Sequence, residues 1–254
     1  MSSITTKMVN LQIIGKNNKI YLGGIKLMNN TYSNTYTFKD YLGKTILTMT
    51  LGLAITAISS FLFSFVNPMT IYNLHFVLLL AQLGLVFFFS RKLMTMSKNT
   101  AWICYIAYSA LMGVTLSSIT YVYAGSTITL AFATTTVLFA CMAIIGQTTN
   151  VDLTKFSSLF MIGLVGLLIV TVLNNWIFRS TVMDLLLCYA GVILFLGLIA
   201  YDIQKLHQFY SLGFSDPELM EKITIYGAFE LYLDFLNLFI RILQVFANRR
   251  SNRN

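Results

Sequence analysis

The sequence predicts an all-α integral membrane protein with seven transmembrane helices. Of its 254 residues, 57% are hydrophobic and only 10% are charged, whereas soluble domains average roughly 45–50% and 25%. Long apolar runs follow one another from residue 45 to residue 247, and a helix needs roughly 20 such residues to cross a bilayer. The runs are continuous and do not alternate with polar residues, which excludes the strands of a transmembrane barrel.

The apolar runs define seven expected spans. In order, they cover residues 45–66, 74–90, 101–123, 127–146, 156–176, 182–200 and 223–247. Asn67-Pro68 closes the first run, and Arg91-Lys92 closes the second. The chain therefore divides into a polar basic N-terminal tail (1–44), a seven-helix transmembrane domain (45–247) and a basic C-terminal tail (248–254).

The net charge of +8 comes from lysines and arginines in the tails and the loops. Six lysines lie in the first 44 residues, whereas the connection over 67–73 has no lysine or arginine. The positive-inside rule then places the N-terminus in the cytoplasm. We expect a multi-pass protein of a bacterial cytoplasmic membrane, because no organelle-retrieval signal ends the chain. The charges face lipid headgroups, and we expect no nucleic-acid partner.

The last apolar segment carries Glu230, Asp234 and Arg241, which makes it an unusual span. If it crosses the membrane, the arginines of the C-terminal tail lie outside, against the positive-inside rule. If it enters and returns, they stay inside. Because late charges weigh less than early ones in this rule, we expect a seventh span that the other six shield from lipid.

Acidic residues in two neighbouring spans indicate where function resides. Asp202 ends the sixth span and Asp234 lies within the seventh. An acid in a membrane is costly, faces the bundle interior and marks an ion or proton path. Helical spacing also places Glu230, Asn237 and Arg241 on the same stripe as Asp234, so we expect these three residues to line a pore.

Asp202 and Asp234 approach each other if their helices pack antiparallel. Two adjacent carboxyl groups do not both ionise cheaply, so the pair responds to pH as a unit. Doubly ionised, the pair offers oxygen ligands to a hard cation such as Ca²⁺, which makes the two aspartates the expected metal contacts. A purely structural role is the alternative. Asp202 would then pair with Lys205, and Asp234 with Arg241 or Arg91.

Two stretches resemble a known family. AYDIQKL (200–206) is similar to the sixth-helix signature of the transmembrane Bax inhibitor motif family, and LYLDFLNLFI (231–240) is similar to the signature of its last helix. Weaker similarity covers FKDYLGKTILTMTLGLAITAIS (38–59) and AYSALMGVTLSS (107–118). The resemblance spans residues 38–247 and leaves the first 37 residues outside.

This resemblance implies seven helices, with the last one central and wrapped by the other six. It also implies a pH-sensitive Ca²⁺ leak in which Asp202 and Asp234 act as proton sensor and gate. Arg91 matches a basic residue that interacts with the gate. In many members an acid lies in the second helix, where this chain has Gln82, which we include among the expected pore-lining positions.

We therefore expect a calcium (cation) leak channel and not an enzyme. Its partners would be the lipid bilayer, Ca²⁺ and protons, with Ca²⁺ as the transported ion and no cofactor. An intramembrane protease is disfavoured, because the chain has no GxSxG motif and neither His75 nor His207 lies in mid-span. The remaining alternative is a non-catalytic membrane adaptor that binds a membrane protease or a stress-response partner. The direction of the pH response stays open.

Overall fold

The computed structural model describes residues 21–22, 25–26, 37–93, 95–213 and 216–251. The chain forms two compact units, Met1–Thr37 and Phe38–Asn254. In the first unit, strands β1 (Tyr21–Leu22) and β2 (Ile25–Lys26) pair antiparallel. The second unit is helical and contains all of the predicted site residues.

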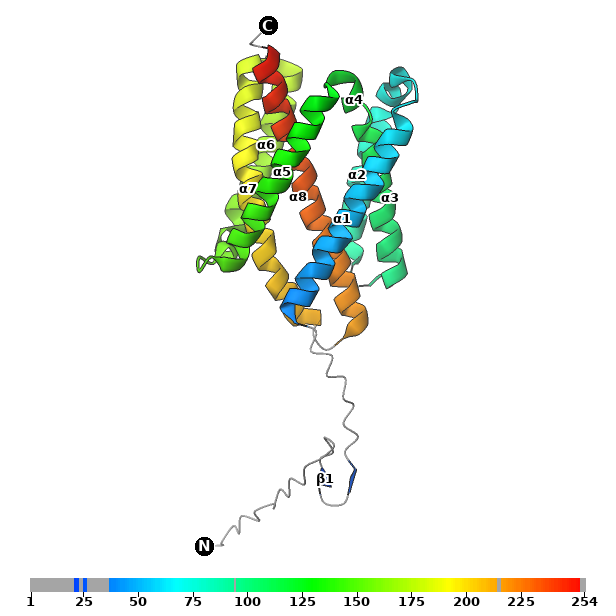
Figure 1. The fold of residues 1–254 in the computed structure, drawn as a ribbon, viewed down its shortest axis with the longest axis vertical. Coiled ribbons are helices and arrows are strands. Elements are labelled where there is room, and N and C mark those ends of the chain that lie inside the picture. Colours follow the sequence, from blue (N-terminus) through cyan, green and yellow to red (C-terminus); the bar gives the residue numbers. More distant parts are fainter. Residues whose placement is uncertain (1–20, 23–24, 27–36, 94, 214–215, 252–254) are drawn as a thin grey trace. The chain divides into compact units, whose positions relative to one another are not determined.

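The helical unit contains the following elements in chain order (Figure 1): α1 (Phe38–Phe63), α2 (Pro68–Lys92), α3 (Lys98–Leu116), α4 (Ile119–Val122), α5 (Gly125–Thr148), a 3₁₀ turn η1 (Leu153–Phe156), α6 (Ser157–Leu173), a π turn η2 (Asn174–Phe178), α7 (Thr181–Gly213) and α8 (Pro217–Ser251). Among the described residues, seven helical segments are long and apolar enough to cross a membrane. Two of them are composite, since α3 continues into α4, and η1, α6 and η2 form one segment. The prediction of seven spans is confirmed.

Local sequence signals explain where two of these helices begin. The Asn67 side chain accepts a hydrogen bond from the Met69 amide at 2.9 Å, and Pro68 occupies the first turn of α2. Asp216 caps α8 in the same way, accepting from the Glu218 amide at 2.9 Å. Proline suits the first helical turn because its missing N–H would have no partner there. These caps define the first turns of α2 and α8.

Helix α8 is one continuous helix of 35 residues, which excludes the alternative that this segment enters the membrane and returns. At 1.5 Å per residue it is about 52 Å long, more than the roughly 30 Å of a bilayer core. Figure 1 shows that α1 begins at one end of the bundle and α8 finishes at the other. We call these the near end and the far end.

Helix α8 is also the most buried span. In its apolar window 72% of residues are buried, against at most 39% in any other span. It packs against α1, α3, α5 and α7, and its Leu231 and Leu238 side chains are fully buried. The other spans expose large apolar side chains, such as Ile162 and Ile193, which is the expected pattern in a lipid solvent. That all six spans surround α8 stays a prediction.

Small residues and buried hydroxyls hold the helices close. A Cβ added at Gly113 of α3 would lie 2.5 Å from the Thr56 carbonyl oxygen of α1, so only glycine allows this approach. The Thr56 hydroxyl in turn meets the Tyr232 hydroxyl of α8 at 2.6 Å. Because lipid offers no hydrogen-bond partners, such contacts between spans satisfy polar groups that would otherwise lack hydrogen bonds.

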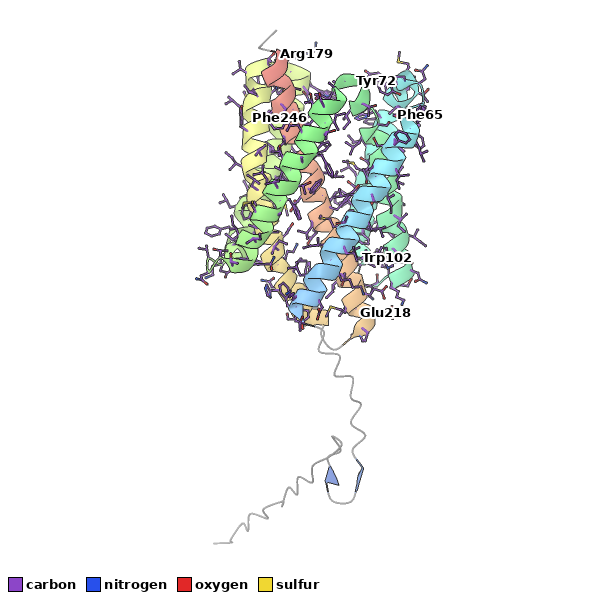
Figure 2. All side chains as sticks on the ribbon, viewed as in Figure 1. Phe65, Tyr72, Trp102, Arg179, Glu218 and Phe246 are labelled. Carbon is purple, nitrogen blue, oxygen red and sulfur yellow. The ribbon has the colours of Figure 1, made fainter. Side chains whose placement is uncertain are left out.

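Aromatic side chains mark both ends of the bundle. Figure 2 shows Trp102 toward the near end and Phe65, Tyr72 and Arg179 toward the far end. Trp176, in η2 at the far end, is 80% exposed. Tryptophan and tyrosine are enriched at membrane–water interfaces, so this placement agrees with a bundle that spans the bilayer.

Candidate functional site

A cavity of about 590 Å³ opens between α6, α7 and α8. Its polar lining includes Asp202 and Lys205 of α7 together with Glu230, Asp234 and Asn237 of α8. We call this the acidic cavity and define it by these five residues. All five lie in membrane-spanning segments. The cavity therefore places three carboxyl groups and one ammonium inside the bundle.

Asp202 and Asp234 are the most deeply placed acids of the cavity. Their exposed fractions are only 8% and 6%, and their carboxyl groups are direct neighbours. The structure thus brings the two predicted gate residues together across the α7–α8 contact. The buried Oδ2 atom of Asp234 has no hydrogen bond from a described residue.

An ion pair lies beside these aspartates. The Lys205 Nζ atom donates to Glu230 Oε1 at 2.6 Å, and the two side chains are 25% and 17% exposed. The second Glu230 oxygen is buried and accepts no hydrogen bond from any residue that the structure describes. Sequence reasoning suggested Lys205 as a partner of Asp202, but the structure pairs the lysine with Glu230. Lys205 lies one turn after Asp202 and Glu230 one turn before Asp234, so antiparallel packing places them opposite each other.

The other predicted pore-lining residues divide between the acidic cavity and elsewhere. Asn237 lines the cavity, and its Nδ2 atom donates to the Leu233 carbonyl at 2.8 Å. Gln82 instead joins α2 to α3 by donating to the Thr115 hydroxyl at 2.7 Å. Arg241 lines a different cavity at the far end. The structure therefore assembles Glu230 and Asn237 with the aspartates, but not Gln82 or Arg241.

The structure does not bring Arg91 to the aspartates. Its side chain is exposed in the last turn of α2. Within the described part of the chain the ion pairs are Lys98–Glu221, Lys155–Asp152 and Lys205–Glu230. The proposed structural pairings of Asp202 with Lys205 and of Asp234 with an arginine are thus not among them. A role for Arg91 as gate partner stays a prediction.

The site has few fixed metal ligands. Across the described ranges, no group of three or more His, Cys, Asp or Glu side chains is arranged to hold a metal ion. Ca²⁺ takes six to eight oxygen ligands, so the aspartates alone would hold it only together with water or amide oxygens.

One further contact near the site was not anticipated from the sequence. Gln204 lies two residues from Asp202, and its side-chain amide forms two hydrogen bonds with the backbone of the connection between α5 and η1. Its Oε1 atom accepts from the Leu153 amide, and its Nε2 atom donates to the Val151 carbonyl, both at 2.8 Å. This pair of bonds ties a near-end loop to the part of α7 that carries Asp202. The only sequence signal was a polar residue within the AYDIQKL stretch.

Asp152 lies in that same connection, just outside the spans. Its carboxylate accepts hydrogen bonds from the Thr154 hydroxyl at 2.5 Å and from the Thr154 amide at 3.1 Å. These bonds, the hydroxyl first, lower the pKa of Asp152 below its usual value, and nearby Lys155 acts in the same direction. Asp152 is therefore an ionised surface acid and forms no part of the cavity.

Comparison with known proteins agrees with this arrangement. A family model described as "Inhibitor of apoptosis-promoting Bax1" matches residues 38–251. The inner membrane protein YbhL of Escherichia coli K12 is 36% identical over 210 residues, which cover 80% of this chain and 88% of YbhL. An uncharacterized protein of Borreliella burgdorferi is 35% identical over 221 residues, covering 84% and 93%. The chain therefore belongs to the Bax inhibitor-1-like family of multi-pass membrane proteins.

Proposed function

We propose that this protein is a pH-sensitive cation leak channel that transports Ca²⁺ and is gated by Asp202 and Asp234. The observation that carries the proposal is the burial of two adjacent carboxyl groups, one from α7 and one from α8, in a single cavity inside the spans. Membership of the Bax inhibitor-1-like family supports it. The proposal needs no covalent chemistry and no resident cofactor.

The charge of the acidic cavity favours cations. When ionised, its three carboxylates outnumber the single Lys205 ammonium. A cavity lined by an excess of one charge concentrates counter-ions, particularly between low-dielectric walls. Carboxylate oxygens are also the ligands that Ca²⁺ prefers. We therefore assign the cavity to the conduction path.

Protonation of the aspartate pair would close this path. With one proton, the two carboxyl groups share a hydrogen bond and hold α7 against α8. With none, they repel each other or accept a cation. Flux should then rise between pH 6 and pH 8. The opposite direction would follow from an ionic latch between Arg91 and an aspartate, but the exposed Arg91 side chain does not support that latch in this structure.

Orientation follows from the lysines. The near end carries Lys39, Lys92, Lys98 and Lys155 in helix termini and loops, so we place it on the cytoplasmic side of a bacterial inner membrane. The relative YbhL is named an inner membrane protein.

The test is Ca²⁺ flux into dye-loaded proteoliposomes at pH 6, 7 and 8. Wild type should leak more at the higher pH, and Asp202→Asn and Asp234→Asn should each flatten this dependence. Asp152→Asn is the matched control, because it makes the same change at an exposed acid outside the cavity. A folded wild-type protein that leaks no faster than empty liposomes would contradict the proposal. The adaptor alternative would then be favoured.

A further inference from the structure

A second polar cavity, of about 410 Å³, lies at the far end of the bundle. Its lining comes from α4, α6, η2, α7 and α8, and its polar side chains include Thr171, Asn175, Asp184, Arg241 and Gln244. We call it the far-end cavity. It shares no lining residue with the acidic cavity, and the leak function proposed above makes no use of it.

Arg241 lines this cavity and forms no ion pair with any residue that the structure describes. It lies within the α8 span, and its Nη2 atom donates to the Thr171 hydroxyl over a long 3.5 Å. None of the ion pairs formed by the described residues includes it. A guanidinium has five N–H donors, and an unpaired charge in a membrane segment is costly. The arrangement therefore leaves donors available for an anion.

The fold leaves room for this side chain. A Cβ added at Gly191 of α7 would lie 3.0 Å from Arg241 Nε and 3.1 Å from its Cγ and Cδ atoms. An alanine at this position would require the arginine to shift by a few tenths of an ångström, and a larger side chain would have to displace it. The guanidinium thus lies across a glycine in the middle of a helix, which is an otherwise unfavourable place for glycine.

The carboxylate in the cavity is engaged elsewhere. Asp184 Oδ1 accepts a hydrogen bond from Asn174 Nδ2 at 2.5 Å, and Asn174 Oδ1 also accepts from the Ser180 amide at 3.2 Å. These bonds close the turn from η2 into α7. Asp184 forms no ion pair with Arg241, so this carboxylate, although it lines the same cavity, does not occupy the donors of the guanidinium.

We propose that the far-end cavity is a binding site for a phosphate group held by Arg241. The planar fork of arginine matches two oxygens of a phosphate, and Thr171 and Gln244 line the same space. Arg241 lies ten residues before the end of α8 at Ser251, which is about 15 Å along the helix. That depth suits a phospholipid headgroup, although a free phosphate has the same chemistry.

The test is ligand binding to the purified, delipidated full-length protein, measured by native mass spectrometry. The probes are phosphatidylglycerol, a diacylglycerol with the same acyl chains, and inorganic phosphate. Arg241→Gln should weaken phosphate-dependent binding at least about tenfold, as expected for a lost charge-assisted hydrogen bond. Gly191→Leu should also weaken it, because it keeps the arginine but places a large side chain in the space that the Arg241 side chain occupies. Arg179→Gln is the control, since this arginine is exposed at the same end.

The outcomes separate the sources of phosphate. Arg241-dependent binding of phosphatidylglycerol, with none of diacylglycerol, would support a headgroup site, and equally tight binding of inorganic phosphate would support a free phosphate. Equal binding by wild type and Arg241→Gln would overturn the proposal. So would equal binding of phosphatidylglycerol and diacylglycerol. If Arg241→Gln does not fold, Gly191→Leu decides in the same way, because wild-type affinity in that variant would also overturn the proposal.

Discussion

Replacing Lys205 with methionine should destabilise the protein more than any other single change in the acidic cavity. The substitution removes the cation that pairs with Glu230 among the described residues, and within that same part of the chain the second Glu230 oxygen already lacks a hydrogen bond. Removing one member of a buried ion pair costs roughly 3–5 kcal/mol. Because the two side chains are 25% and 17% exposed, we expect about 2–3 kcal/mol of unfolding free energy to be lost.

Replacing the other member of this ion pair should cost less unfolding free energy. In Glu230→Gln, the Lys205 ammonium still has two favourable neighbours. These are the Asp202 carboxyl group and the Phe209 ring, whose centroid lies 5.2 Å from the Nζ atom. The expected loss is about 1 kcal/mol, the usual net worth of one hydrogen bond. The double variant should lose less than the sum of the two single variants, because the loss of Lys205 then no longer leaves a Glu230 carboxylate without its ion-pair partner.

The assay is unfolding by SDS in mixed micelles, followed by the helical circular dichroism signal. Lys98→Met provides the control, because it removes a lysine from the Lys98–Glu221 pair at 3.4 Å, whose side chains are 50% and 30% exposed. That change should stay within about 0.5 kcal/mol. Equal losses in Lys205→Met and Lys98→Met, or a larger loss in Glu230→Gln than in Lys205→Met, would refute this account of the cavity.

Two further predictions concern the contact between α5 and α7 and the near-end loop. Gly146→Ala should cost about 1–3 kcal/mol of unfolding free energy in the same assay, because its Cβ would lie 2.6 Å from the Ala200 carbonyl oxygen. Gly166→Ala is the control, since a Cβ there meets nothing within 4 Å. Equal losses in the two variants would contradict the close packing at Gly146. For Asp152, hydrogen bonds from Thr154 lower the folded pKa, so its contribution to stability is present above the unfolded value of about 3.9 and is lost as pH falls through the folded value. The melting-temperature difference between wild type and Asp152→Asn should therefore shrink from pH 5 to pH 3, and a difference that grows on acidification would contradict this sign.

The spans were predictable because hydropathy alone decides which segments enter a bilayer. The helix ends were not, because a helix continues beyond the bilayer wherever its residues permit. The first span was expected from residue 45 and the sixth to residue 200, yet α1 begins at Phe38 and α7 continues to Gly213. The roughly two additional turns of α1 and roughly the last three and a half turns of α7 carry polar residues. From hydropathy alone, these polar residues are predicted to lie in a tail or a loop.

The site was predictable in part, for a similar reason. Asp202 and Asp234 stand out because acids are rare inside spans. The pairing of Lys205 with Glu230 depends on the depth at which α7 lies against α8. A crossing of two helices is determined by side-chain ridges and grooves along the whole contact, so the motif residues alone do not specify it. Gln204 required still more, since its partners are backbone atoms of a loop some fifty residues away in sequence.

Arg241 shows how a helical stripe can mislead. Helical periodicity places Arg241 on the same face as Asp234, but it specifies only the angle around the helix axis and not the distance along it. Seven residues also separate the two along the axis by about 10 Å, and the structure assigns them to different cavities. Had the arginine paired with the aspartate, each would have neutralised the other. Their separation leaves an excess of carboxylates in one cavity and, among the described residues, a guanidinium without an ion pair in the other, which is why we propose ligands of opposite charge for the two cavities.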